Sequence, residues 1–258
     1  MTPRPVLNPR PWRPPGPGNL LADHLRAAGL EVREHPVIEI RPESGRELTS
    51  AVTALSRGDY DHLVLTSART IDALLALRDA EGRPLLRVPP RTHVAVVGRT
   101  TAETAREHGI PVHLEAGGSG ADLVERFPAA PEEGRTVLLP ASRAASPTVS
   151  SGLREAGYRV DAVTAYHPQP VPLPTEVATA LRTGGFSAVV LTSGMIARLI
   201  ADSGVHPATA VVVIGEPTED AARAAGLTVA ARSPDPGEAA LSRAVVSAVR
   251  RSDPEEAP

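Results

Sequence analysis

Two stretches of the chain share one pattern: "YDHLVLTSARTIDALLA" occupies residues 60–76, and "FSAVVLTSGMIARLIAD" occupies residues 186–202. Each reads as a short apolar strand, then a Thr-Ser pair, then an amphipathic helix. The second copy begins at residue 186, which is 126 positions after residue 60. The repeat indicates that one α/β unit occurs twice in the chain.

The similarity continues beyond both Thr-Ser pairs. "VAVVGRTTAETAREHGIPVHLEA" (94–116) and "AVVVIGEPTEDAARAAGLTVAARS" (210–233) each predict a strand, a glycine, a helix that starts in threonine, a glycine stop and a short strand. The first copy is longer because the loop "AEGRPLLRVPP" (80–90) reads as a surface insertion. Two matched copies predict two similar domains.

Short β-rich runs alternate with helical patterns along nearly the whole chain. Most of the runs are continuously apolar, as in parallel strands that are buried on both faces. Such alternation predicts α/β domains with parallel sheets. The candidate strands are 6–9, 31–40, 62–66, 93–97, 112–115, 136–140, 159–166, 187–192, 209–214 and 228–232.

The proline-rich stretch "AVTAYHPQPVPLPTE" (162–176) separates the two copies and reads as an extended linker. If the first strand and helix belong with the second copy, the chain crosses between domains twice. We therefore predict one domain from residues 1–39 plus 173–258 and another from 43–166. Segments 40–42 and 167–172 would form a two-stranded hinge.

Composition excludes several classes of function. Cysteine is absent, which removes disulfides, thiolate catalysis and cysteine-ligated metals. The net charge is −3 with mixed signs, and no basic run suits nucleic acid. The start lacks the apolar core of a signal peptide, and no apolar run is long enough for a bilayer. We expect a cytoplasmic monomer without a membrane or nucleic-acid partner.

Candidate binding groups lie where the predicted parallel strands end and the next helices begin. Ligands of open α/β sheets bind at that edge, and helix N-termini favour anions. The alternative is ordinary helix capping by serine and threonine, and "TTAE" (100–103) fits a capping box. The groups are Thr66-Ser67, Gly98-Arg99-Thr100-Thr101, Thr192-Ser193 and Gly215–Thr218.

Tyr166 is one of only three tyrosines and ends the strand before the linker. It is either a functional group at the domain boundary or a ring packed at a strand end.

Other kinds of catalytic or binding site have little support in the sequence. Eight scattered histidines have no metal-site spacing, so we expect no metal. "GGSGADL" (117–123) lacks the dinucleotide fingerprint and leads into a predicted helix at 121–127. No G-x-S-x-G elbow occurs, and Glu115, Asp122 and Glu125 read as a solvated edge.

Seven segments, taken in order, resemble the uroporphyrinogen-III synthase family over roughly residues 20–245. They are "GLEVREHPVIEI", "YDHLVLTSARTIDALL", "VAVVGRTTAETAREHGI", "GSGADLVERF", "VLLPASRAASPTVSSGLREAGYRVDAVTAYHPQP", "SAVVLTSGMIARLI" and "VVVIGEPTEDAARAAGL". The resemblance implies two flavodoxin-like domains and cofactor-free cyclisation of hydroxymethylbilane to uroporphyrinogen III. In the family's scheme, ring D is inverted through a spiro intermediate.

The resemblance also implies site residues. Tyr166 matches the family's functional tyrosine, which is proposed to assist departure of the substrate's hydroxyl group. The positions that match those assigned to carboxylate binding are Ser67, Arg69, Thr101, Ser193 and Thr218, with Gly98 and Gly215 beside them, and Arg10 and Arg143 as looser matches.

The chain departs from the family pattern at the predicted ligand edge. Pro217 stands where a threonine is common, and Gly194 opens a helix where the family often has another residue. Two alternatives therefore stay open beside the synthase. One is a paralogue that catalyses another cyclisation or rearrangement. The other is a non-catalytic two-domain module that binds an anionic small molecule.

Overall fold

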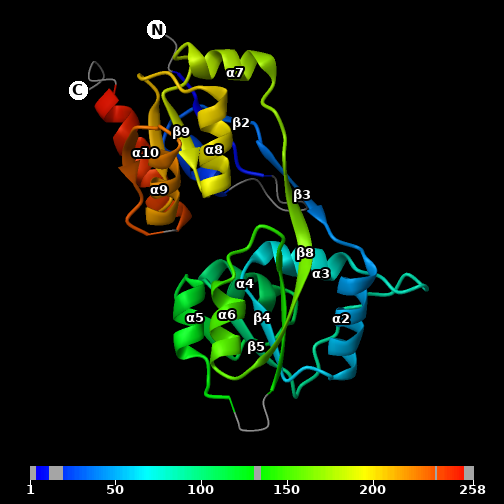
Figure 1. Ribbon diagram of the computed structural model, residues 1–258. Coiled ribbons are helices and arrows are strands. Elements are labelled where there is room, and N and C mark those ends of the chain that lie inside the picture. The colour runs from blue at the N-terminus through cyan, green and yellow to red at the C-terminus, as the bar shows by residue number, and fades with distance from the viewer. Residues whose placement is uncertain (1–3, 12–19, 131–134, 236, 253–258) are drawn as a thin grey trace. The chain divides into compact units, whose positions relative to one another are not determined.

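The computed structural model describes residues 4–11, 20–130, 135–235 and 237–252. The chain divides into two compact units (Figure 1), unit 1 from residues 1–39 and 169–258 and unit 2 from residues 40–168. Each unit holds one sheet with helices on both faces. The predicted fold class, two similar α/β domains with parallel sheets, is confirmed.

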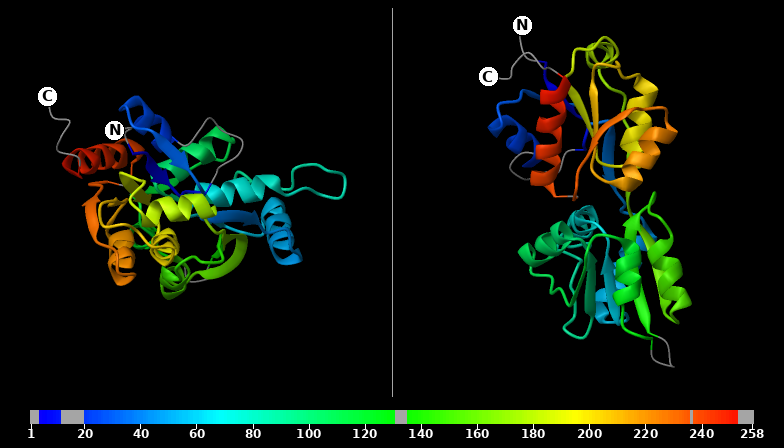
Figure 2. Two further views of the ribbon diagram at one scale, coloured as in Figure 1. Left: turned by 90° about the horizontal axis from the view of Figure 1, so that it is seen from above. Right: turned by 90° about the vertical axis from the view of Figure 1, so that its left-hand side faces the viewer.

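Unit 1 is built on a five-stranded parallel sheet in the order β2-β1-β9-β10-β11, which is the flavodoxin order. Helices α1 and α10 cover one face, and α8 and α9 lie on the other (Figure 2, right). The elements are β1 (Val6–Asn8), α1 (Leu20–Ala27), β2 (Val32–Glu34), α7 (Thr175–Arg182), β9 (Ala188–Leu191), α8 (Gly194–Ser203), β10 (Ala210–Val213), α9 (Glu216–Ala224), β11 (Val229–Arg232) and α10 (Glu238–Ser252).

Unit 2 has a six-stranded sheet in the order β3-β8-β7-β4-β5-β6. Helices α2, α3 and α4 cover one face, and α5 and α6 cover the other. The elements are β3 (Ile38–Pro42), α2 (Arg46–Arg57), β4 (His62–Leu65), α3 (Ala68–Ala76), β5 (His93–Val97), α4 (Arg99–Glu107), β6 (Leu114–Ala116), α5 (Gly120–Arg126), β7 (Thr136–Ser142), α6 (Thr148–Glu155) and β8 (Arg159–Pro170).

The two sheets are related by a circular permutation. Strands β4, β5, β6, β7 and β8 of unit 2 take the places of β9, β10, β11, β1 and β2 of unit 1. The registers agree, because Val6 pairs with Ala188 in unit 1 and Val137 pairs with His62 in unit 2. The sequence repeat therefore covers β4 to β6 and β9 to β11, which follow one another in the same order in both units. Strand β1 of unit 1 corresponds to β7 of unit 2.

The predicted strand 31–40 is wrong as a single element. It is split into β2, which lies in the sheet of unit 1, and β3, which lies at the edge of the unit 2 sheet. Pro36 stands between them, and proline cannot donate to a strand ladder. The predicted linker 162–176 is also partly wrong, because β8 continues as a strand to Pro170.

Strands β3 and β8 are hydrogen-bonded neighbours. The amide of Glu43 donates to the carbonyl of Ala165 at 2.8 Å, and the amide of Val171 donates to the carbonyl of Val37 at 2.9 Å. Residue numbers rise on one strand as they fall on the other, so these two strands run antiparallel. The two segments by which the chain passes between the units are therefore tied together by backbone hydrogen bonds.

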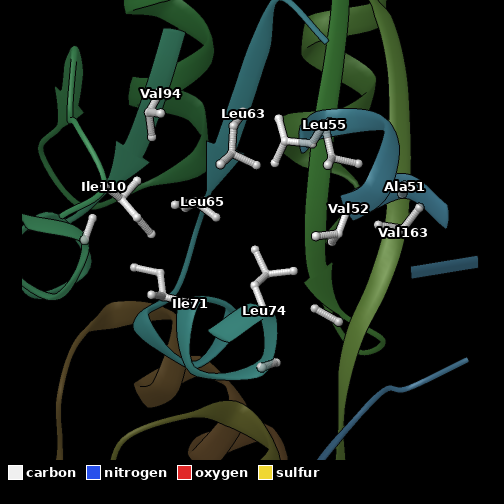
Figure 3. Close-up of a cluster of buried hydrophobic side chains, with 14 of the residues drawn as sticks. Ala51, Val52, Leu55, Leu63, Leu65, Ile71, Leu74, Val94, Ile110 and Val163 are labelled. Carbon is white, nitrogen blue, oxygen red and sulfur yellow. The ribbon is translucent and has the colours of Figure 1, made fainter. Parts of the chain in front are cut away.

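The core of unit 2 is aliphatic, as a composition of only 2% aromatic residues requires. Leu63 and Leu65 of β4 point toward Leu55 of α2 and toward Ile71 and Leu74 of α3 (Figure 3). All five side chains are fully buried. This packing holds α3 against the sheet and so fixes where its first turn begins.

Candidate functional site

The first candidate group in unit 2 follows β4. Ser67 is the N-cap of α3, and its Oγ accepts a hydrogen bond from the amide of Arg69 at 3.2 Å. Ser67 is therefore a capping residue, as one of the two sequence interpretations proposed. Arg69 lies in the first turn of the same helix and is partly buried.

The second group follows β5, the parallel neighbour of β4. Gly98 is the N-cap of α4 with a φ of 81°, a conformation that only glycine adopts without strain. No side chain caps this helix, which begins at Arg99, so the predicted capping box at 100–103 is wrong. Thr101 is only 5% exposed, and its hydroxyl has no hydrogen-bond partner within the described residues.

Unit 1 repeats this arrangement at β9 and β10. Ser193 is the N-cap of α8, and its Oγ accepts from the amide of Ile196 at 3.3 Å. Gly215 is the N-cap of α9, again without a side-chain cap. Thr218 stands three residues after Gly215, as Thr101 stands after Gly98, and it is equally buried. Among the residues that the structure describes, its hydroxyl has no partner either.

Each unit thus brings two helix N-termini together at the carboxyl edge of its sheet. One is capped by serine, and the other begins at glycine with a nearly buried threonine in its first turn. Strands β4 and β5 are parallel neighbours, as are β9 and β10. Unpaired amides and the helix dipole make such ends favourable for anions. The arrangement suits a ligand that carries several carboxylates.

Both departures from the family pattern have a structural reason. Pro217 lies in the first turn of α9, where the missing amide breaks no helical hydrogen bond. A Cβ on Gly194 would lie 3.0 Å from the Cβ of Ala221 in α9, so glycine here permits close packing of two helices. The prediction that Gly194 opens a helix is confirmed.

The two looser arginine candidates differ in their surroundings. Arg10 is engaged within unit 1, where its Nη1 lies 2.8 Å from both carboxylate oxygens of Glu238. Arg143 follows β7 and is exposed, and its side chain has no ion-pair partner in the described part of the chain. Its backbone amide donates to the carbonyl of Tyr166 at 3.0 Å. Arg143 is therefore the one available to a ligand.

Tyr166 lies within β8, not at its end. Its neighbour on β7 is Ser142. The residue is 8% exposed, and its ring belongs to the aliphatic core of unit 2. The hydroxyl forms no hydrogen bond with any of the described residues. An anchored ring with an uncommitted hydroxyl can act as a positioned proton donor.

Sequence reasoning missed the pair beside Tyr166. Nε2 of His167 lies 2.7 Å from Oε2 of Glu43, the residue that directly follows β3. This hydrogen bond, followed by those from the amides of Gly45 and Ser44, lowers the pKa of the Glu43 carboxyl. The two residues are 124 positions apart, and only the pairing of β3 with β8 brings them together.

Two buried polar groups were also missed. Asn8 ends β1, is fully buried, and leaves its Nδ2 without a partner among the described residues. Thr70 lies in the first turn of α3, and its Oγ1 is unpaired within the same part of the chain. For Asn8 the only sequence signal was a polar residue directly after an apolar run, and for Thr70 there was none. Glu115, Asp122 and Glu125 are partly or fully exposed, as predicted for a solvated edge; Asp122 also accepts from the amide of Gly117, and Glu115 pairs with Arg106 at 2.9 Å.

Within the described residues, no three histidine or acidic side chains are grouped so that they could hold a metal ion. The helices of this same part of the chain include none that is long and apolar enough to cross a membrane.

Comparison with known proteins gives one consistent result. A family description for uroporphyrinogen-III synthase HemD matches residues 19–243. The uroporphyrinogen-III synthase of Synechococcus elongatus is 31% identical over 190 residues, which cover 72% of this chain and 70% of that protein.

Solved structures agree on the fold. A mutant uroporphyrinogen III synthase of Thermus thermophilus matches with a TM-score of 0.63 and 20% identity, over 96% of this chain and 99% of that one. The uroporphyrinogen-III synthetase of Helicobacter pylori matches with a TM-score of 0.66 and 15% identity, over 95% and 99%. The chain belongs to the uroporphyrinogen-III synthase family.

Proposed function

We propose that this enzyme, a cyclising lyase, converts hydroxymethylbilane into uroporphyrinogen III with Tyr166 as proton donor and the paired helix N-termini as carboxylate sites. Membership of the family carries the reaction class. The observation that supports the assignment of the site is the repeated geometry, in which both units place two helix N-termini side by side at a carboxyl edge.

The reaction asks the protein for positioning and for one proton. Protonation lets the terminal hydroxyl of the substrate leave as water, and the remaining azafulvene is attacked by the substituted carbon of ring D. The spiro intermediate then opens and recloses with ring D inverted. Loss of the pyrrole N–H proton on forming the azafulvene balances the proton given to the leaving hydroxyl. All carbon–carbon bonds are made and broken within the substrate, so correct orientation supplies much of the rate enhancement.

Tyr166 suits the proton-donor role because its ring is fixed in a packed core while its hydroxyl is uncommitted among the described residues. A donor that is already hydrogen-bonded would have to break that bond before it served the substrate. We assign carboxylate binding to Thr101 and Thr218 by the same reasoning, and to Ser67 and Ser193 through the backbone amides of the turns that they cap.

The remaining candidate residues contribute to substrate binding less directly. Arg69 and Arg143 supply positive charge near the N-terminus of α3 and the end of β7. Gly98 and Gly215 open α4 and α9 without a side chain, and the space that a Cβ would enter holds no atom of the described residues within 4 Å. Arg10 acts through Glu238 and holds the first strand of unit 1 to α10. We also propose that the enzyme works in the cytoplasm as a monomer.

The test is a coupled assay in which hydroxymethylbilane synthase generates the substrate from porphobilinogen. The products are oxidised and isomers I and III are separated. Spontaneous closure gives isomer I. An excess of isomer III that scales with the amount of protein supports the proposal. Isomer I alone, from folded protein, would contradict it and favour a paralogue or a non-catalytic binding module.

A further inference from the structure

A cavity of about 240 Å³ lies at the amino edge of the unit 2 sheet, at the opposite ends of the strands from Ser67 and Thr101. His62 opens β4, and His93 opens β5 as its register partner. His113 stands just before β6. The three imidazoles form a row with ring centroids 5.8 Å and 5.0 Å apart, and all three line the cavity.

The walls of the cavity are mostly apolar. Five of its nine lining residues are apolar, among them Leu114 and Phe127. The Phe127 ring lies 5.1 Å from the His62 ring and meets Tyr158 edge-on at the same distance. A dry cavity of about 150 Å³ already admits benzene. A space of this size and lining therefore suits one or two fused rings.

His62 gives the cavity a polar group that the fold does not require. It is 4% exposed, and its Nε2 has no hydrogen-bond partner in the described part of the chain. Leaving a buried polar atom unpaired costs free energy. The residue at the same sheet position in unit 1 is Ala188, so the fold accepts a methyl group there in place of an imidazole. Burial, helped by His93, lowers the pKa of His62 to about 4, so its ring is neutral at pH 7.

Arg126 brings a positive charge to the rim, and its ion-pair partner, Asp122, lies outside the lining. Arg126 lines the cavity, and its Nη1 is oriented by the carbonyl of Glu115 at 3.0 Å, with Asp122 farther away at 3.6 Å. Among the described residues, no carboxylate belongs to the lining. His113 accepts the amide of Val94 at Nδ1, so the proton of its neutral ring is on Nε2, where it can be donated.

We propose that this cavity binds a small aromatic carboxylate, with its rings against Phe127 and the imidazole row and its carboxylate at the Arg126 rim. The ring walls select a flat apolar body, and the guanidinium and imidazole donors select one anionic group. The site lies at the other end of the strands from the proposed substrate groups, so the inference does not depend on the tetrapyrrole reaction.

The test is calorimetric titration of the full-length protein with 2-naphthoate and with uncharged 2-naphthamide. A ligand of this size should bind with a Kd of about 1 mM or tighter. The amide should bind at least about tenfold more weakly, since a charge-assisted hydrogen bond is lost. In NMR spectra of histidine-labelled protein, addition of 2-naphthoate should shift the ring resonances of His62 and His93 and leave that of His206 unchanged.

Two variants give the test its specificity. Arg126→Gln should bring the naphthoate affinity down to that of the amide. Arg106→Gln is the matched control, because Arg106 is an exposed arginine that also contacts Glu115 but does not line the cavity, and it should leave both affinities unchanged. Absence of binding, equal affinity for acid and amide, or an unaffected Arg126→Gln variant would each overturn the proposal.

Discussion

Tyr166 combines two properties that rarely occur together in one tyrosine. Its ring is held among the aliphatic side chains of unit 2, and its hydroxyl has no partner in the described residues. The other two tyrosines use their hydroxyls, since Tyr60 donates to Asp161 and Tyr158 donates to the carbonyl of Pro128. The difference separates a structural tyrosine from one that is available for chemistry.

Tyr166→Phe should lower the rate of isomer III formation by on the order of 10²-fold, because a general acid is removed. The melting temperature should hardly change, since the ring and its packing are retained. Tyr158→Phe is the matched control: it removes a bonded hydroxyl at the amino edge and should leave turnover intact. An unchanged rate for Tyr166→Phe would remove this residue from the mechanism.

Thr101, like Thr218, has a nearly buried hydroxyl without a hydrogen-bond partner among the described residues. Thr101→Val keeps its shape and removes the oxygen, so kcat/KM should fall about tenfold through the loss of a hydrogen bond to a charged group. Thr101→Ser should restore most of the activity. Thr53→Val, which removes a hydroxyl that bonds within α2, should leave the kinetics unchanged. Wild-type kcat/KM for Thr101→Val would exclude a direct contact with the substrate.

His62 makes unit 2 sensitive to acid. Its folded-state pKa of about 4 lies below the usual 6.5, so the folded state binds fewer protons than the unfolded one. Its contribution to stability is complete above pH 6.5 and is lost as the pH falls toward 4, by about 3 kcal/mol in all. Urea unfolding of wild type and His62→Phe across this range should show a flatter profile for the variant. Parallel profiles would contradict the assignment.

At the scale of elements, the apolar pattern was sufficient to predict a strand or helix wherever one continuous stretch of sequence forms one element. The apolar runs at 62–66, 187–192 and 209–214 correspond to β4, β9 and β10, shifted by one residue at their ends. The run at 31–40 failed because both of its halves have β propensity, and only the fold assigns them to different sheets. The capping box failed because Gly98 opens α4 before its threonines.

Helices α5 and α6 approach so closely that each carries a glycine at the contact, Gly120 in α5 and Gly152 in α6. A Cβ on Gly152 would lie 2.7 Å and 2.9 Å from the two Cγ atoms of Val124. Gly152→Ala should therefore lower the free energy of unfolding by about 1–2 kcal/mol, as overpacking outweighs the gain in helix propensity.

The pair Gly152→Ala with Val124→Ala tests this cause directly. Removing the Cγ atoms makes room for the new methyl group, so the double variant should be more stable than the two single changes add up to. Urea denaturation of the four proteins measures the coupling. Strict additivity would show that the helices separate instead of clashing.

At the scale of the whole molecule, the sequence repeat predicts two similar domains, but it cannot show that one is a circular permutation of the other. That relation depends on β1 pairing with β9 across 182 positions. The site was predictable where strand ends carry hydroxyls and glycines. The Glu43–His167 pair was not, because Glu43 follows β3 and His167 lies on β8, and the antiparallel pairing of these strands leaves no pattern in the sequence.

Unit 2 is continuous in the chain and has its own sheet and core. The domain limits 43–166 and the hinge segments stay predictions, and a fragment of residues 40–168 tests their basis. It should unfold cooperatively in urea with circular dichroism typical of an α/β fold. In a fragment of residues 1–168, hydrogen exchange should protect β4 and β5 but not Val6–Asn8, because β9 is absent. A fragment 40–168 that stays unfolded would contradict the prediction.

The permutation also orders events during synthesis. Val6 leaves the ribosome 182 residues before Ala188, its partner on β9. At about 5–20 residues per second, roughly 10–40 s pass in which β1 and its neighbour β2 have been made and its other neighbour, β9, has not. All strands of the other sheet emerge within that interval. Translation therefore delivers all of unit 2 first, and the sheet of unit 1 is completed only when β9 emerges and pairs with a strand that was made before unit 2.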